Sequence, residues 1–147
     1  WRIRRPPKAT LFPYTTLFRS IFNDIIKRNE KAVFILLNID NFKDLNDFYG
    51  FDVGDGILYK VANRLKLFVT EFFPKETKIF RLGGDDFGIL VNTQSKTIAF
   101  NSLVLNFLNK ISETNFNTKG FKIRITISAA SLKKSLIYKL PTLLWNF

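Results

Sequence analysis

Cysteine, histidine and methionine are all absent from this 147-residue sequence. Without cysteine the chain can form neither disulfide bonds nor thiolate metal sites. Without histidine, the most common general base, proton transfer would have to use carboxylates, lysines or tyrosines. Hydrophobic residues make up 46% of the chain, yet no run of about 18 apolar residues occurs, which argues against a membrane span. The length suits one domain with a single core.

The first twenty residues differ in character from the rest. The segment TLFPYTTLFRS, at residues 10–20, resembles a one-frame translation of a sequencing adapter. We therefore expect residues 1–20 to be non-native, and the absence of methionine at position 1 is typical of an internal fragment. The alternative is a basic, proline-containing arm that contacts nucleic acid or an anionic membrane surface.

Positive charge is concentrated in this same segment. It holds five of the 23 lysines and arginines and none of the 12 acidic residues, so without it the formal net charge falls from +11 to +6. The remaining charge suits a nucleoside triphosphate ligand without demanding one. We expect no nucleic-acid partner, and deletion of residues 1–20 would show whether any such affinity comes from the arm.

A short glycine turn carries two carboxylates in the middle of the chain. Residues 81–87 read RLGGDDF, between strand-like residues 78–80 and 87–91. This pattern predicts a β-hairpin that bends at Gly83 and Gly84, because glycine adopts positive φ without strain. On its own, such a motif can also be an ordinary solvated hairpin tip.

A second segment favours a functional interpretation. Residues 34–55 form an apolar strand ending in NID, followed by FKDLND and then GFDVGD. Together the two segments resemble the GGDEF domain of diguanylate cyclases over residues 21–128, with GGDDF as the variant of the name motif. Residues 21–147 would then be a GGDEF domain that is incomplete at its C-terminus.

The hydrophobic periodicity predicts an α+β fold. Helices are expected at residues 21–28, 41–49, 53–68 and 95–112, and strands at 32–39, at both arms of the hairpin and at 121–128. After the first helix the order is β-α-α-β-β-α-β. We expect a ferredoxin-like, palm-type nucleotidyl cyclase sandwich, with a mixed sheet and flanking helices.

The resemblance implies a divalent metal, Mg²⁺ or Mn²⁺, at the end of the first strand. Its ligands would be the side chain at position 38, the backbone carbonyl of Ile39 and the carboxylate of Asp85. Position 38 is normally Asp in the family but is Asn38 here, which removes a negative charge and should weaken the site. Asp40 or Asp86 could compensate. Alternatively, Asn38 or Asp40 caps the helix that follows.

The resemblance makes Asp86, together with Asp85, the catalytic pair. Asp86 occupies the position of the family's glutamate, which is proposed to help deprotonate the attacking ribose 3′-hydroxyl. Aspartate is one methylene shorter, so this base could be misplaced. Both departures, at positions 38 and 86, predict reduced activity.

Four further residues match the family's substrate-binding positions. Asn46 and Asp55 stand where guanine is read, and a carboxylate and an amide have the acceptors and donors that this base requires. Phe42 and Lys43 begin a helix whose free N–H groups would meet the phosphates. Otherwise Asn46 and Lys43 are solvated helix residues, and Asp55 is an acid favoured by the helix dipole.

The resemblance therefore implies condensation of two GTP to cyclic di-GMP with release of pyrophosphate. A second GGDEF domain would complete a homodimer, with a fused sensory domain upstream. We expect a cytoplasmic domain, which could belong to a membrane-anchored sensor. The alternative is a degenerate GGDEF module that binds GTP without turnover and regulates a fused or partner domain. Product formation would separate the two.

Overall fold

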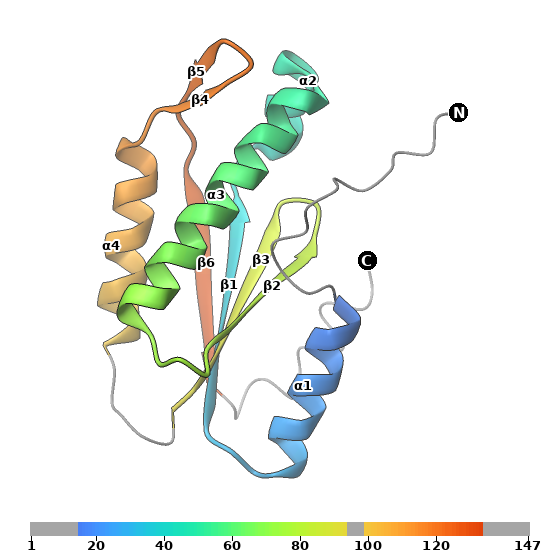
Figure 1. Cartoon of the computed structure of the whole chain (residues 1–147), viewed down its shortest axis with the longest axis vertical. Helices are drawn as coiled ribbons and strands as arrows, with labels where there is room; N and C mark the ends of the chain where they lie inside the picture. The colour runs from blue at the N-terminus through green and yellow to red at the C-terminus, as the bar shows by residue number, and fades with distance from the viewer. Residues whose placement is uncertain (1–14, 94–98, 134–147) are drawn as a thin grey trace.

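The computed structural model describes residues 15–93 and 99–133. Its elements, in chain order, are α1 (Thr15–Lys27), β1 (Ala32–Ile39), α2 (Phe42–Tyr49), α3 (Phe51–Phe72), β2 (Lys78–Gly83), β3 (Asp86–Asn92), α4 (Phe100–Glu113), β4 (Phe116–Thr118), β5 (Phe121–Ile123) and β6 (Ile127–Lys133). Figure 1 shows α3 crossing in front of the sheet, with α4 beside β6 and α1 beside the β2 edge.

Within the described residues, four strands form the central sheet, in the order β2-β3-β1-β6. Strand β1 pairs with β3 on one side and with β6 on the other, and β2 pairs with β3. This order confirms the ferredoxin-like α+β fold. The sheet is antiparallel where a mixed sheet was expected, because both neighbours of β1 run opposite to it.

Each face of the sheet has its own core. Alternate side chains of β1, such as Ile35 and Leu37, pack with α2, α3 and α4 in the larger cluster. The side chains between them, such as Phe34, pack against Phe22 of α1 in a smaller cluster. Strand β1 is therefore covered on both faces, which explains its continuous apolar sequence.

Several expectations about element boundaries need correction. Helix α3 was expected at residues 53–68 but spans Phe51–Phe72. Helix α1 begins at Thr15, six residues before its expected start. Residues 121–128 were expected to form one strand, but they split into β5 and the start of β6, and β4 was not anticipated. Helix α4 begins at Phe100, and residues 94–98 lie outside the described residues.

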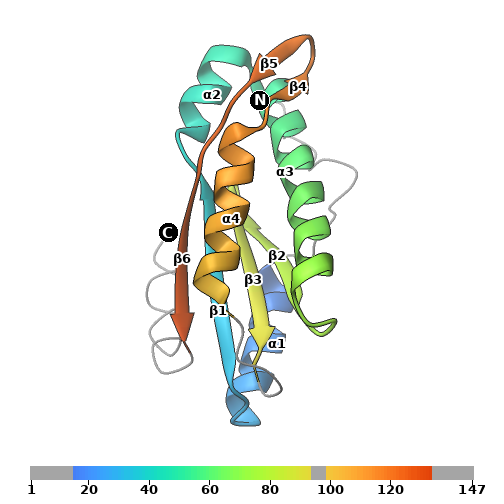
Figure 2. The ribbon, with the colours of Figure 1, turned by 90° about the vertical axis from the view of Figure 1, so that its left-hand side faces the viewer.

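Residues 121–128 divide into β5 and the start of β6 because their two ends pair with different parts of the chain. The backbone N–H of Asp40 donates to the carbonyl of Thr126 at 3.0 Å, so the chain joins β1 at this point. Upstream, residues 121–123 pair with β4 instead. The β4–β5 hairpin and α2 lie together at the end of the molecule where β1 terminates, and the second view shows the same arrangement (Figures 1 and 2).

Candidate functional site

The end of β1 and the β2–β3 turn form one corner of the sheet. Asn38, the penultimate residue of β1, pairs directly with Asp86, the first residue of β3. The turn between β2 and β3 has φ values of 146° at Gly83 and 45° at Gly84. Both values fall in the region that favours glycine, so the Gly-Gly pair sets the shape of this turn. Arg81 strengthens it by donating to the Gly84 carbonyl, at 2.8 Å from one guanidinium nitrogen.

Asn38 contacts both turn carboxylates. Its side-chain Nδ2 donates to Asp85 Oδ2 at 3.0 Å and to Asp86 Oδ1 at 2.8 Å. The backbone N–H of Ile39 also donates to the Asp85 carbonyl, at 3.3 Å. The structure therefore places the end of β1 beside Asp85 and Asp86.

Asp86 lies in an environment that disfavours its charge. Burial raises the pKa of the Asp86 carboxyl above its usual 3.8, and the neighbouring Asp85 carboxylate raises it further. The hydrogen bond from Asn38 acts in the opposite direction. A partly desolvated carboxylate with a raised pKa is a better proton acceptor than an exposed one, as a general base requires.

Asp40 belongs to a different hydrogen-bond network. The hydroxyl of Thr126 donates to Asp40 Oδ2 at 2.5 Å, and that of Ser128 donates to Oδ1 at 2.6 Å. These bonds, led by the one from Ser128, lower the pKa of Asp40 below 3.8. Both carboxylate oxygens are thus engaged with the chain that leads into β6. Sequence reasoning missed these hydroxyl partners, which lie 86 and 88 positions away in the chain.

Neither Asn38 nor Asp40 caps α2. The residue at the N-cap position is Asn41, in the left-handed region with φ of 55°, and it makes no side-chain capping bond. At the start of the helix, Phe42 is buried and packs into the larger core, whereas Lys43 is exposed. The first N–H groups of a helix have no partner within it, so they remain available to an anion.

Helices α2 and α3 meet closely at Asn46. A Cβ placed on Gly54 would lie 1.8 Å from Asn46 Oδ1, so only glycine allows this approach. Oδ1 of Asn46 is buried and has no hydrogen-bond partner among the residues that the structure describes. The other predicted guanine-reading residue, Asp55, follows Gly54 and is exposed. The structure therefore brings positions 46 and 55 to the same junction of two helices.

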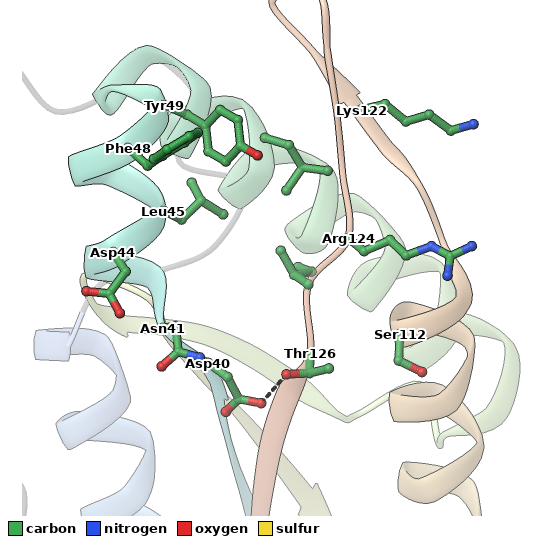
Figure 3. Close-up of a pocket in the computed structure, with 12 residues that line it drawn as sticks. Asp40, Asn41, Asp44, Leu45, Phe48, Tyr49, Ser112, Lys122, Arg124 and Thr126 are labelled. Carbon is green, nitrogen blue, oxygen red and sulfur yellow. Dashed lines mark hydrogen bonds between the residues drawn. The ribbon is translucent and has the colours of Figure 1, made fainter.

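A groove of about 690 Å³ opens on another side of α2. Figure 3 shows Leu45 and Tyr49 of α2 facing the segment of Lys122, Arg124 and Thr126. Of the residues predicted to form the site, only Asp40 lines this groove, through its bond to Thr126. The groove is therefore separate from both the carboxylate pair and the Asn46 junction.

The chemistry of the corner is that of a carboxylate pair. No group of three or more acidic, histidine or cysteine side chains suitable for a metal occurs within residues 15–93 and 99–133. Even so, Asp85 Oδ2 and Asp86 Oδ1 both lie within 3.0 Å of a single atom, Asn38 Nδ2. Two oxygens that converge in this way can share a hard cation.

Curated relatives match most of this chain but only part of their own length. An uncharacterized membrane protein of Staphylococcus haemolyticus (strain JCSC1435) is 30% identical over 110 residues, which cover 73% of this chain and 30% of that protein. A counterpart in Staphylococcus aureus (strain USA300) is 29% identical over 109 residues, covering 72% and 29% respectively. The chain thus spans less than a third of these relatives. In its own described part, no helix is long and apolar enough to cross a membrane.

Solved structures share the fold at low sequence identity. The GGDEF domain of DgcB from Caulobacter crescentus, in complex with c-di-GMP, matches with a TM-score of 0.74 and 16% identity, over 99% of this chain and 92% of that one. Diguanylate cyclase SiaD from Pseudomonas aeruginosa, in complex with its activator SiaC, matches with a TM-score of 0.73 and 18% identity, over 97% and 56%. The family profile "Diguanylate cyclase, GGDEF domain" matches residues 14–142. With the GGDDF turn set against the end of β1, this match shows that the chain belongs to the GGDEF domain family of diguanylate cyclases.

Proposed function

We propose that this domain condenses two GTP molecules to cyclic di-GMP and releases pyrophosphate. The observation that carries the proposal is the convergence of Asp85 and Asp86 at the end of β1, where Asn38 Nδ2 lies within 3.0 Å of both carboxylates. A partly buried carboxylate pair of this kind is a typical place for metal-assisted phosphoryl chemistry. Family membership supports the choice of reaction.

A divalent cation, Mg²⁺ or Mn²⁺, would be the cofactor. Its donors would be the Asp85 carboxylate and the Ile39 carbonyl, with Asp86 alongside. These are oxygen-rich groups, so the residues present fit a hard cation. When bound, the ion supplies Lewis-acid polarisation of the α-phosphate and offsets charge on the triphosphate.

Asp86 would accept the proton of the attacking hydroxyl. In each half-reaction the ribose 3′-oxygen forms a bond to the α-phosphorus of the other GTP, and the bond from that phosphorus to the bridging oxygen breaks. Pyrophosphate leaves, and the 3′-hydroxyl proton passes to the Asp86 carboxylate. The raised pKa of Asp86 supports this role.

Guanine would be read at the junction of α2 and α3. Asn46 has a buried oxygen without a partner in the described residues, which suits a ligand donor such as a guanine N–H group. Asp55 would accept from the same edge of the base. Phe42 and Lys43 lie at the start of α2, where backbone N–H groups and an ammonium would meet the phosphates.

Two domains would act together, each holding one GTP, because the attacking and leaving groups belong to different substrate molecules. Holding them face to face makes an otherwise bimolecular step intramolecular. The curated relatives extend well beyond the matched segment and are called membrane proteins, which supports a fused sensory domain and a membrane-anchored sensor as the setting.

A second candidate is a degenerate module that binds GTP without turnover and regulates a fused or partner domain. Asn38 in place of the family's Asp, and the shorter Asp86 in place of Glu, favour this alternative. Formation of cyclic di-GMP separates the two candidates, since both would bind GTP.

Calorimetric titration with GTP and ATP tests the site itself. We expect the protein to prefer GTP by at least about tenfold, because a site that pairs with a base's donors is left unpaired by a base lacking them. Asp55→Ala should narrow the preference. Asp52→Ala is the matched control, since Asp52 is another exposed acid in the first turn of α3. Equal affinities for the two nucleotides in the unmodified protein would contradict the assignment.

A further inference from the structure

The amide of Asn38 is placed as a hydrogen-bond donor to both turn carboxylates. Both of its hydrogen bonds at the corner come from Nδ2, to Asp85 at 3.0 Å and to Asp86 at 2.8 Å. Ionised carboxylates only accept hydrogen bonds, so the NH₂ end of the amide is the end that must face them. The two N–H groups are thereby both used, one on each carboxylate.

The hydrogen bonds from Asn38 offset the electrostatic repulsion between the Asp85 and Asp86 carboxylates. Asp85 and Asp86 are adjacent carboxylates, and Asp86 is partly desolvated. No ion pair joins either to a cation in the part of the chain that the structure describes. Arg81, on the same turn, donates to the Gly84 carbonyl instead. The donor shared by the two carboxylates is the neutral amide.

We propose that the side-chain amide of Asn38 occupies the place of the metal between Asp85 and Asp86. The amide therefore competes with a divalent cation for this space. In the metal-free protein the amide holds the two carboxylates together and keeps the β2–β3 turn in place. A cation can take up the carboxylate oxygens only when the amide moves out. The inference rests on the metal site of the proposed function but not on turnover.

The substitution Asn38→Ala distinguishes a competitor from a ligand. Removing a ligand weakens metal binding, whereas removing a competitor strengthens it. In calorimetric titrations with Mg²⁺ alone, we expect Asn38→Ala to bind about tenfold more tightly than the unmodified chain, the equivalent of one hydrogen bond to a charged group. Equal or weaker binding by Asn38→Ala, including no binding by either protein, overturns the proposal.

Thermal unfolding provides the matched control. Asn92, at the far end of β3, also donates through Nδ2 to a carboxylate, that of Glu30, at 2.9 Å. We expect Asn38→Ala to lower the midpoint of unfolding in EDTA and Mg²⁺ to restore it. Asn92→Ala should lower the midpoint equally in EDTA and in Mg²⁺. If Asn38→Ala lowers the midpoint of unfolding and Mg²⁺ does not restore it, the proposal is contradicted.

The unmodified chain gives a separate test that does not require the variant to fold. In nuclear magnetic resonance spectra, the side-chain NH₂ signals of Asn38 should shift as Mg²⁺ is added, because the amide leaves its carboxylate acceptors. Signals that stay in place while Asp85 and Asp86 respond to the cation would overturn the proposal. None of these measurements uses cyclic di-GMP synthesis, so failure here and failure of the proposed function are distinguishable.

Discussion

Two aspartates at the same end of the sheet, Asp40 and Asp86, lie in opposite environments. Asp40 accepts hydrogen bonds from two hydroxyls, which lower its pKa. Asp86 is partly buried beside another carboxylate, which raises its pKa. The first arrangement stabilises the fold, whereas the second costs stability, and such costs are typical of functional sites. The comparison separates a structural aspartate from a candidate catalytic one.

The largest expected effect belongs to Asp86. We expect Asp86→Asn to lower cyclic di-GMP synthesis at least about 100-fold, since a general base typically contributes that much or more. The same change should raise the thermal stability, because it removes a desolvated charge next to Asp85. Asp24→Asn, which makes the same charge change on α1, should do neither. If Asp86→Asn keeps full activity, Asp86 is not the base.

Asp40 should show the reverse behaviour. We expect Asp40→Ala to lower the free energy of unfolding by about 1–2 kcal/mol, because two hydroxyl hydrogen bonds are lost at a partly exposed position. Product formation should continue. Loss of product formation in a fully folded Asp40→Ala protein would instead identify Asp40 as the compensating metal ligand.

The free energy of unfolding should depend on pH in opposite directions through Asp40 and Asp86. The pKa of Asp40 is lower in the folded state, so its contribution is present above 3.8 and is lost as pH falls through the folded pKa. The pKa of Asp86 is higher in the folded state, so stability is lost as pH rises from 3.8 through the folded pKa. Chemical denaturation at pH values below and above 3.8 would measure both effects. Asp40→Asn should lower the free energy of unfolding mainly above the folded pKa of Asp40. Asp86→Asn should raise the free energy of unfolding mainly above the folded pKa of Asp86. Parallel curves for both variants would contradict the assignments.

The smallest expected effect is that of one hydroxyl. Thr126→Val preserves the side-chain shape but removes the donor to Asp40 Oδ2, so it should cost about 0.5–1.5 kcal/mol. It should also move the pKa of Asp40 back toward 3.8. Carboxyl chemical shifts measured against pH would report that change, and an unmoved pKa would show that Ser128 alone sets it.

Much of this arrangement could be predicted from local sequence. The apolar run of β1 gave its boundaries at Ala32 and Ile39, and Gly83 and Gly84 gave the hairpin turn. The meeting of Asn38 with Asp85 and Asp86 followed from the fold that the motifs implied. Such features depend on residue type and spacing, which the sequence shows directly.

The remaining features depend on partners distant in the chain. Residues 121–128 alternate as one strand would, and the break follows from pairing with Asp40 on one side and with β4 on the other. The two ends of the Asn38 amide have nearly the same shape, so its role as a donor follows only from the carboxylates that face it. The opposite pKa shifts of Asp40 and Asp86 arise likewise from tertiary neighbours.

The most direct test of the proposed function is the identity of the product. The full chain would be incubated with GTP and saturating Mg²⁺, and cyclic di-GMP would be quantified by mass spectrometry, with Asp86→Asn as the negative control. We predict cyclic di-GMP and pyrophosphate from the unmodified chain, more product from Asp86→Glu, and a lower Mg²⁺ requirement in Asn38→Asp. Binding of GTP without any cyclic di-GMP, in the parent and in both of these variants, would contradict the cyclase assignment and favour the regulatory module.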